Sequence, residues 1–274
     1  GELMQGGGVG EVVISNHPDW KPGDIAESMA VGWQEYAVSD GSDLRRIDPE
    51  LAPLSTALGV LGMPGQTGYT ALMRHGRPQP GETVVVSAAS GAVGTVVGQT
   101  AKMTGARAVG IAGGPEKCRF LIEELGFDAA ADHRAADFAG QLAQACPQGI
   151  DVYFDNVGGP VFETVLPLLN PKARIPVCGL ISQYNATALP DGPDRMSLLM
   201  GTILRKRMTV RGFIVFDDFG HLYPEFAKQM GDWVTQGKIK YREEMIGGLE
   251  QAPAAFVGLL NGEAFGKRVI KLSA

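Results

Sequence analysis

The fold of this chain is decided by one stretch, TVVVSAASGAVGTVVG, which spans residues 83–98. Its first residues are apolar and β-branched, as in a strand buried on both faces of a parallel sheet. A turn with glycine follows, and residues 92–104 then have a helical pattern. Such a turn lets the backbone approach a pyrophosphate, whose charge is met by free N–H groups at the helix start. The stretch therefore predicts a dinucleotide site held by Gly91, Ala92, Val93 and Gly94.

The turn is an altered form of the G-x-G-x-x-G fingerprint, because Ala89 stands where the first glycine is expected. An alternative interpretation is that Gly91, Gly94 and Gly98 only let the helix pack closely on the sheet. The position between a buried strand and a helix favours the nucleotide interpretation.

Strands and helices alternate along the chain from residue 66 onward. We expect strands at residues 83–87, 107–111, 129–131, 150–154, 173–178 and 208–215. We expect helices at residues 66–73, 92–104, 116–125, 135–145, 161–168, 196–205 and 223–236. This order is typical of right-handed βαβ units and predicts an α/β fold with a Rossmann doubly wound parallel sheet.

The chain up to residue 62 has a different pattern. Short strands are expected at residues 9–14 and 33–38, on either side of a turn cluster, as in an antiparallel barrel. Because a glycine-rich strand begins almost at residue 1, we expect that N-terminal strands of this barrel are absent from the chain. Leucines at helical spacing after Asp48-Pro49 predict a helix over residues 48–62. A last strand is expected at residues 269–272.

The composition narrows the class of protein. The chain has 24 basic and 30 acidic side chains, a formal charge of −6, which argues against nucleic acid and membrane surfaces as partners. No apolar run approaches the roughly 18 to 20 residues that span a bilayer, and the first residues lack the features of a signal peptide. Three scattered cysteines favour a reducing compartment, so we expect a cytoplasmic protein.

The second strand of the unit indicates which dinucleotide is bound. An NAD enzyme usually carries an acid about 20 residues past the phosphate turn. Here Gly113 and Gly114 end the strand and Lys117 follows in the first helical turn. A cation at this place favours the extra phosphate of NADP. The alternative is that Lys117 is an ordinary solvated helix residue.

Three ordered motifs carry a resemblance to a known family. They are AASGAVGTVVGQ at residues 88–99, YFDNVGG at residues 153–159 and CGLISQYN at residues 178–185. Together they closely resemble the zinc-independent medium-chain reductases, a family that includes the leukotriene B4 12-hydroxydehydrogenases, prostaglandin reductases and curcumin reductases. The resemblance implies a homodimer, a GroES-like barrel domain over residues 1–65 and 238–274, and a Rossmann NADP-binding domain over residues 66–237.

The same resemblance implies an activity and a set of site residues. The activity is NADPH-dependent reduction of the C=C bond of α,β-unsaturated ketones or aldehydes. Lys117 would meet the 2′-phosphate, His133 would lie beside the adenine, and Asn156 would lie near the cofactor. The residues implied on the nicotinamide side are Cys178, Gly179, Leu180, Ile181, Ser182, Tyr184, Phe213, Ile214 and Val215. The chain departs from the family at His133, where relatives often have tyrosine, and at Ala264, where they usually have asparagine.

The implied reaction needs little acid–base machinery. Hydride reaches the β-carbon, charge develops on the carbonyl oxygen, and a hydrogen-bond donor placed at that oxygen lowers the barrier. Tyr184 is the expected catalytic donor, because ligands of such sheets bind beyond the carboxyl ends of the strands. The alternative is a phenol that only packs on the loop or on the ribose.

Other classes of chemistry have weak support in the sequence. Catalytic zinc needs three converging ligands, and the four histidines show no H-E-x-x-H pairing. A serine hydrolase is disfavoured because no G-x-S-x-G motif is present. An NADPH quinone oxidoreductase and a non-catalytic NADPH-binding protein remain as alternatives. NADPH binding without NADPH oxidation would favour the latter.

Overall fold

The computed structural model describes residues 2–188 and 193–272. The chain forms two compact units, one of residues Gly1–Gly65 with Ala227–Ala274 and the other of residues Gln66–Phe226. Within the described residues, no helix is long and apolar enough to cross a membrane.

The second unit is built on a six-stranded sheet in the order β6-β5-β4-β7-β8-β9. Every neighbouring pair in this sheet is parallel. Its strands are β4 (Thr83–Val86), β5 (Arg107–Ala112), β6 (Ala129–Asp132), β7 (Ile150–Phe154), β8 (Leu169–Val177) and β9 (Thr209–Gly212). The strand order reverses on the two sides of β4, so the predicted doubly wound parallel sheet is confirmed.

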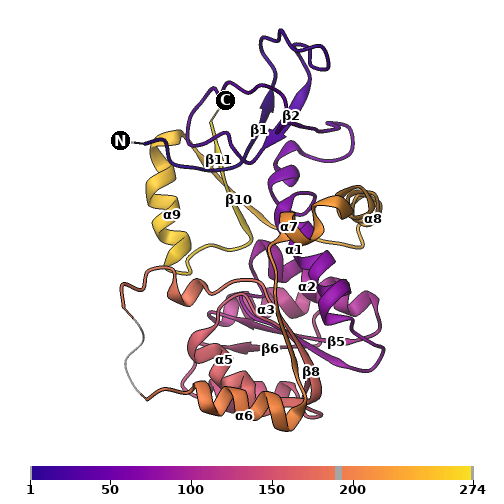
Figure 1. The fold of residues 1–274 in the computed structure, drawn as a ribbon, viewed down its shortest axis with the longest axis vertical. Helices are drawn as coiled ribbons and strands as arrows, with labels where there is room; N and C mark the ends of the chain where they lie inside the picture. The colour runs from indigo at the N-terminus through magenta and orange to yellow at the C-terminus, as the bar shows by residue number, and fades with distance from the viewer. Residues whose placement is uncertain (1, 189–192, 273–274) are drawn as a thin grey trace. The chain divides into compact units, whose positions relative to one another are not determined.

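Helices cover both faces of this sheet. Figure 1 shows α2 and α3 on one side of it and α5 and α6 on the other. The helices of the unit are α1 (Met63–Ala71), α2 (Ala92–Met103), α3 (Pro115–Glu123), α4 (Phe138–Ala145), α5 (Gly159–Val165), α6 (Met196–Lys206), α7 (Val215–Phe219) and the start of α8 (Tyr223–Thr235). The short helical turns are η2 (Leu72–Gly76), η3 (Leu166–Leu168), η4 (Ile181–Gln183) and η5 (Gly220–Leu222). The predicted helices of this region are confirmed within a few residues, whereas α7 is an addition.

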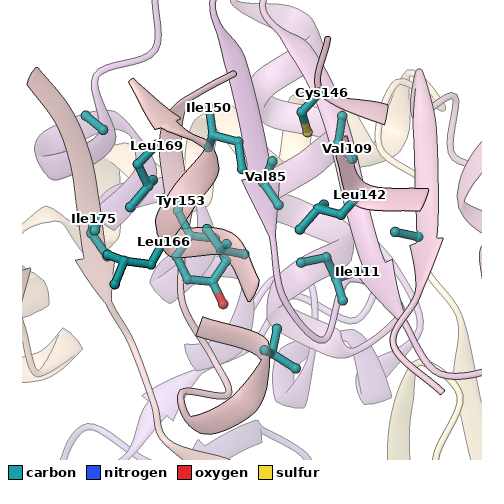
Figure 2. Close-up of a cluster of buried hydrophobic side chains, with 14 of the residues drawn as sticks. Val85, Val109, Ile111, Leu142, Cys146, Ile150, Tyr153, Leu166, Leu169 and Ile175 are labelled. Atoms are coloured by element: carbon teal, nitrogen blue, oxygen red, sulfur yellow. The ribbon is translucent and has the colours of Figure 1, made fainter. Parts of the chain in front are cut away.

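The core of the sheet follows from the alternation of side chains along each strand. Val85 belongs to the cluster that packs against α4 and α5, while Val84 and Val86 lie on the other side of the same strand. All three valines are fully buried, as the continuous apolar run predicts. Figure 2 shows the cluster, in which the Tyr153 ring lies among aliphatic side chains.

The first unit contains two small sheets. β1 (Gly8–Glu11), β2 (Ile25–Ser28) and β3 (Arg45–Arg46) pair antiparallel, and β10 (Glu243–Gly247) pairs with β11 (Lys267–Lys271) in parallel. Its helical elements are η1 (Leu54–Leu58), η6 (Leu249–Gln251), α9 (Ala252–Leu260) and the rest of α8. The strands expected at residues 9–14 and 269–272 are confirmed in part, at shifted bounds.

Two expectations for the first unit are wrong. Residues 33–38 form no strand, and Val38 is fully exposed, so this segment lacks the sheet neighbour that a strand requires. Residues 48–62 form only the short turn η1 in place of a helix. Pro53 comes directly before η1, and a Cβ at Gly62 would lie 1.8 Å from the Ala57 carbonyl oxygen, so the chain folds back too tightly for a longer helix.

Candidate functional site

The turn between β4 and α2 is shaped to meet an anion. Gly91 precedes the helix, and its N–H donates to the Ala88 carbonyl at 3.0 Å. The first intrahelical bond at this end runs from the Thr95 N–H to the Gly91 carbonyl at 3.0 Å. The N–H groups of Ala92, Val93 and Gly94 therefore have no acceptor within the helix. No side chain of the described residues caps this end, so these N–H groups fit a phosphate.

The glycines of this turn have different reasons to be glycine. A Cβ at Gly94 would lie 2.5 Å from the Ala88 carbonyl oxygen, so Gly94 lets the helix start close to the turn. A Cβ at Gly98 would lie 1.8 Å from Cζ of Phe127, so Gly98 serves packing. The nearest atom to a Cβ at Gly91 is the Ala88 oxygen at 3.2 Å. The packing interpretation thus explains Gly98, whereas Gly91 and Gly94 shape the turn itself.

The turn between β5 and α3 lies next to the end of β6. The Gly114 N–H and the Arg134 N–H both donate to Oδ1 of Asp132, at 2.8 and 2.9 Å. Lys117 is half-buried in the first turn of α3. A Cβ at Gly113 would lie 2.9 Å from both Nε2 of His133 and Nε of Arg134. The structure therefore places His133 and Arg134 against the turn that precedes Lys117. Arg134 is thus a second cation near this turn, in addition to Lys117.

Arg134 is not among the site residues predicted from the sequence. The signal that could have found it is a basic residue directly after strand β6, which neighbours β5 at the same edge of the sheet. Desolvation and the neighbouring Arg134 guanidinium lower the pKa of His133 below its ordinary value, against the opposing effect of Asp132. His133 is then neutral at pH 7, which suits a ring that stacks on a base better than one that binds phosphate by charge.

Asn156 lies at the end of β7, beside the end of β4. Its N–H donates to Oγ of Ser87 at 2.8 Å, and its Nδ2 donates to the Ser87 carbonyl at 2.8 Å. Ser87 is the residue before the turn that leads to α2. The predicted site residue Asn156 is thus fixed to the same turn that presents Gly91 and Gly94.

The loop after β8, which we call the Tyr184 loop (residues 178–185), is hydrogen-bonded to the residues that follow β7. The Ile181 N–H donates to the Asn156 carbonyl at 3.3 Å. The N–H and Oγ of Ser182 both donate to the Val157 carbonyl, at 3.2 and 2.6 Å. Tyr184 is 64% exposed, and its hydroxyl oxygen lies 3.1 Å from the place that a Cβ on Gly179 would occupy. The loop therefore presents a phenol at the carboxyl edge of the sheet, close to the Asn156 turn.

Cys178 and Leu180 belong to the same loop and differ in their surroundings. Leu180 is exposed, whereas Cys178 is partly buried. Burial and the nearby Asp155 carboxylate raise the pKa of Cys178 to about 12. Cys178 is therefore a protonated thiol at pH 7. Because only the thiolate is a good nucleophile, Cys178 is suited to lining a pocket and not to nucleophilic catalysis.

The segment from Phe213 to Val215 divides into buried and exposed parts. The Phe213 ring lies 5.6 Å from Phe219 and 5.9 Å from His75 between centroids, within an aromatic cluster. Its side chain is therefore occupied in packing. Ile214 is 63% exposed, and Val215 begins α7.

A zinc site does not fit the described residues. Within residues 2–188 and 193–272, no three side chains of the His, Cys, Asp and Glu type gather to hold a metal ion.

The fold and the site define a class of protein: a reductase-type α/β fold with a dinucleotide turn, cations beside it and a phenol at the sheet edge. Residues 92–236 match the family model described as zinc-binding dehydrogenase, and residues 1–47 match that described as N-terminal domain of oxidoreductase. The chain belongs to this zinc-binding dehydrogenase family, in its branch of curcumin and prostaglandin reductases.

Individual relatives are similar over the whole chain. An NADPH-dependent curcumin reductase of Escherichia coli (strain K12) is 56% identical over 273 residues, which cover 100% of this chain and 79% of the relative. A 2-alkenal reductase (NADP(+)-dependent) of Nicotiana tabacum is 42% identical, over 100% of this chain and 78% of the relative. The crystal structure of CurA in complex with NADPH from Vibrio vulnificus has a TM-score of 0.95 and 55% identity, over 100% of this chain and 81% of that one.

Proposed function

We propose that this protein is an NADPH-dependent reductase of the C=C bond of α,β-unsaturated ketones and aldehydes. The observation that carries the proposal is that three features lie at the carboxyl ends of the strands of one sheet. They are the uncapped start of α2 after β4, the cations after β5 and β6, and the Tyr184 loop after β8. The names of the relatives, an NADPH-dependent curcumin reductase and a 2-alkenal reductase among them, support the same activity.

The residues fit NADP(H) in type and position. The turn at Gly91–Gly94 would hold the pyrophosphate, and Lys117 with Arg134 would hold the 2′-phosphate. His133 would lie beside the adenine, and Asn156 with the loop Cys178–Ser182 would border the nicotinamide, together with Ile214 and the backbone of Phe213. Bound NADPH supplies the hydride for the reaction.

The chain's own contribution to the chemistry is orientation and charge stabilisation. We propose that the Tyr184 hydroxyl donates a hydrogen bond to the carbonyl oxygen of the substrate, where negative charge develops. Tyr184 is 64% exposed, so its side chain is accessible to a ligand.

The test is a pair of measurements on the purified chain. NADPH consumption at 340 nm is followed with a panel of small enones and enals, beside a fluorescence titration with NADPH alone. We expect binding, and oxidation that depends on the enone. Binding without oxidation would support the non-catalytic alternative, and oxidation with quinones alone would support the quinone reductase.

We also propose the roles of the two compact units, and a homodimer in the cytoplasm. The unit Gln66–Phe226 would bind the cofactor, and the other would supply a substrate domain. β9 is an edge strand of the six-stranded sheet, and its four residues are exposed. An exposed edge strand is a template for pairing with another chain, so a second copy is its expected partner. The three cysteines are free, in keeping with a reducing compartment.

A further inference from the structure

A buried carboxylate, that of Asp155, lies just after β7 and accepts four hydrogen bonds. Asp155 is 1% exposed. Its Oδ1 accepts from Oγ of Ser87 at 3.1 Å and from the Tyr153 hydroxyl at 2.8 Å. The same oxygen accepts from the N–H groups of Val157 at 3.0 Å and Gly158 at 2.9 Å. A buried carboxylate is costly unless such donors satisfy it, so this arrangement is built around its charge.

The side chain of Asp155 connects β7 with the end of β4, and its backbone connects β7 with β8. Its N–H donates to the Pro176 carbonyl at 3.0 Å, in a bridge that extends the pairing of β7 with β8. Its carbonyl accepts from the N–H groups of Cys178 at 2.8 Å and Gly179 at 3.2 Å. One residue thus joins the carboxyl ends of β4, β7 and β8.

The groups held by Asp155 lead directly to both ends of the proposed site. Ser87 precedes the phosphate turn and also holds Asn156 through two hydrogen bonds. Gly179 leads to the Tyr184 loop and lies against the Tyr184 hydroxyl. A shift at Asp155 would therefore move the phosphate turn and the phenol relative to each other.

We propose that Asp155 is a positioning residue. It holds three segments in one fixed arrangement: the phosphate turn between β4 and α2 (residues 87–91), the turn after β7 that contains Asn156 (residues 155–158) and the Tyr184 loop (residues 178–185). This inference rests on the proposed function. The charge matters because an ionised carboxylate oxygen accepts several hydrogen bonds, and bonds to a charged group are stronger than bonds to an amide.

The same strand offers a matched control at its opposite end. Oδ2 of Asp151 accepts from the Thr83 N–H of β4 at 2.9 Å, and Oδ1 accepts from Nδ2 of Asn170 in β8 at 2.9 Å. Asp151 therefore connects the same three strands at their amino ends. Its loss tests what such a connection contributes to folding alone.

The experiment compares Asp155→Asn with Asp151→Asn, and adds Ser87→Ala as a milder change in the same network. The thermal midpoint of each variant is measured first. The dissociation constant for NADPH, by fluorescence, and kcat with an enone are then measured well below that midpoint. We expect Asp155→Asn to raise the NADPH dissociation constant about tenfold, as for a weakened hydrogen bond to a charged group. We expect kcat to fall roughly 10- to 100-fold, because small misplacements of reacting groups are costly.

Ser87→Ala should change both constants in the same direction by less, and Asp151→Asn should lower only the thermal midpoint. The inference is overturned if Asp155→Asn and Ser87→Ala change only the midpoint, or if Asp151→Asn alters binding and kcat as much. If Asp155→Asn fails to fold, Ser87→Ala and Tyr153→Phe decide by the same readouts. A wild-type protein that binds NADPH and reduces no enone would contradict the proposed function, while the dissociation constants would still test Asp155.

Discussion

Lys117 and Arg134 bear on the choice between NADPH and NADH. Both lie about the β5–α3 turn, where the acidic residue of an NAD enzyme is absent. Each cation should contribute a charge-assisted contact to the 2′-phosphate. We expect Lys117→Ala and Arg134→Ala each to raise the dissociation constant for NADPH about tenfold or more, and to leave that for NADH nearly unchanged.

Fluorescence titration with both dinucleotides makes this measurement. Arg119→Ala is the control, since Arg119 is an exposed cation on the same helix α3. An equal loss of affinity for NADPH and NADH in the two variants would show that the cations do not read the 2′-phosphate.

Tyr184 is the residue on which the chemistry of the proposal depends. Removing its hydroxyl leaves the ring and the loop in place, so cofactor binding should persist. We expect Tyr184→Phe to lower kcat/KM for an enone by about 100-fold, the size found when one oxyanion donor is lost. Steady-state kinetics and a parallel NADPH titration make the comparison. An unchanged kcat/KM would remove Tyr184 from the mechanism.

At the scale of elements, the sequence predicts the βαβ region well because its central strands β4, β5 and β7 are mostly buried apolar runs. Such a run carries its own signal, as at Thr83–Val86. β10 and α9 were missed because their cues are weak: β10 contains two glutamates, and α9 is apolar nearly all round. Residues 33–38 show the opposite error, since a β-rich composition forms no strand without a partner.

The packing of α2 on the sheet gives a prediction at this scale. Gly98 faces the ring of Phe127, which is 3% exposed. A methyl group there has no room, so Gly98→Ala should destabilise the fold by about 1–3 kcal/mol. Chemical denaturation measures the change. Gly220→Ala is the matched control, because a Cβ at Gly220 would meet nothing within 4 Å. Equal stability of the two variants would contradict this packing.

At the scale of the whole molecule, the exposed edge strand predicts the state of assembly. Val210 lies on β9 and is 42% exposed, and Leu204 on the preceding helix is 78% exposed. We expect the protein to be a dimer by light scattering, and Val210→Lys to shift it toward the monomer, since a charge is unfavourable in a buried interface. Glu123→Lys is the control, because Glu123 is an exposed residue of α3, which packs on β5 and β6 at the opposite end of the same sheet from β9. A monomeric wild-type chain would contradict the homodimer.

The candidate site could be predicted from the sequence only where strand ends carry it. Ligands of such sheets bind beyond the carboxyl ends of the strands, so the Gly91 turn and Tyr184 were predicted from their positions after strands. Asn156 was predicted from the family resemblance. The roles of Asp155 and Arg134 depend on which side chains meet across strands. In the sequence, nothing distinguishes Asp155 from an ordinary polar residue. Its role becomes apparent only from the structure, in which Ser87, Tyr153 and the Val157 N–H donate hydrogen bonds to it.

The central claim, hydride transfer from NADPH to an enone carbon, is tested most directly by isotope labelling. A small enone is reduced with NADPH that carries deuterium at the transferable C4 position, and the product is analysed by NMR. We expect one deuterium at the β-carbon, with the hydrogen at the α-carbon coming from a proton. Deuterium at the carbonyl carbon, or a product without deuterium, would contradict hydride transfer to the β-carbon.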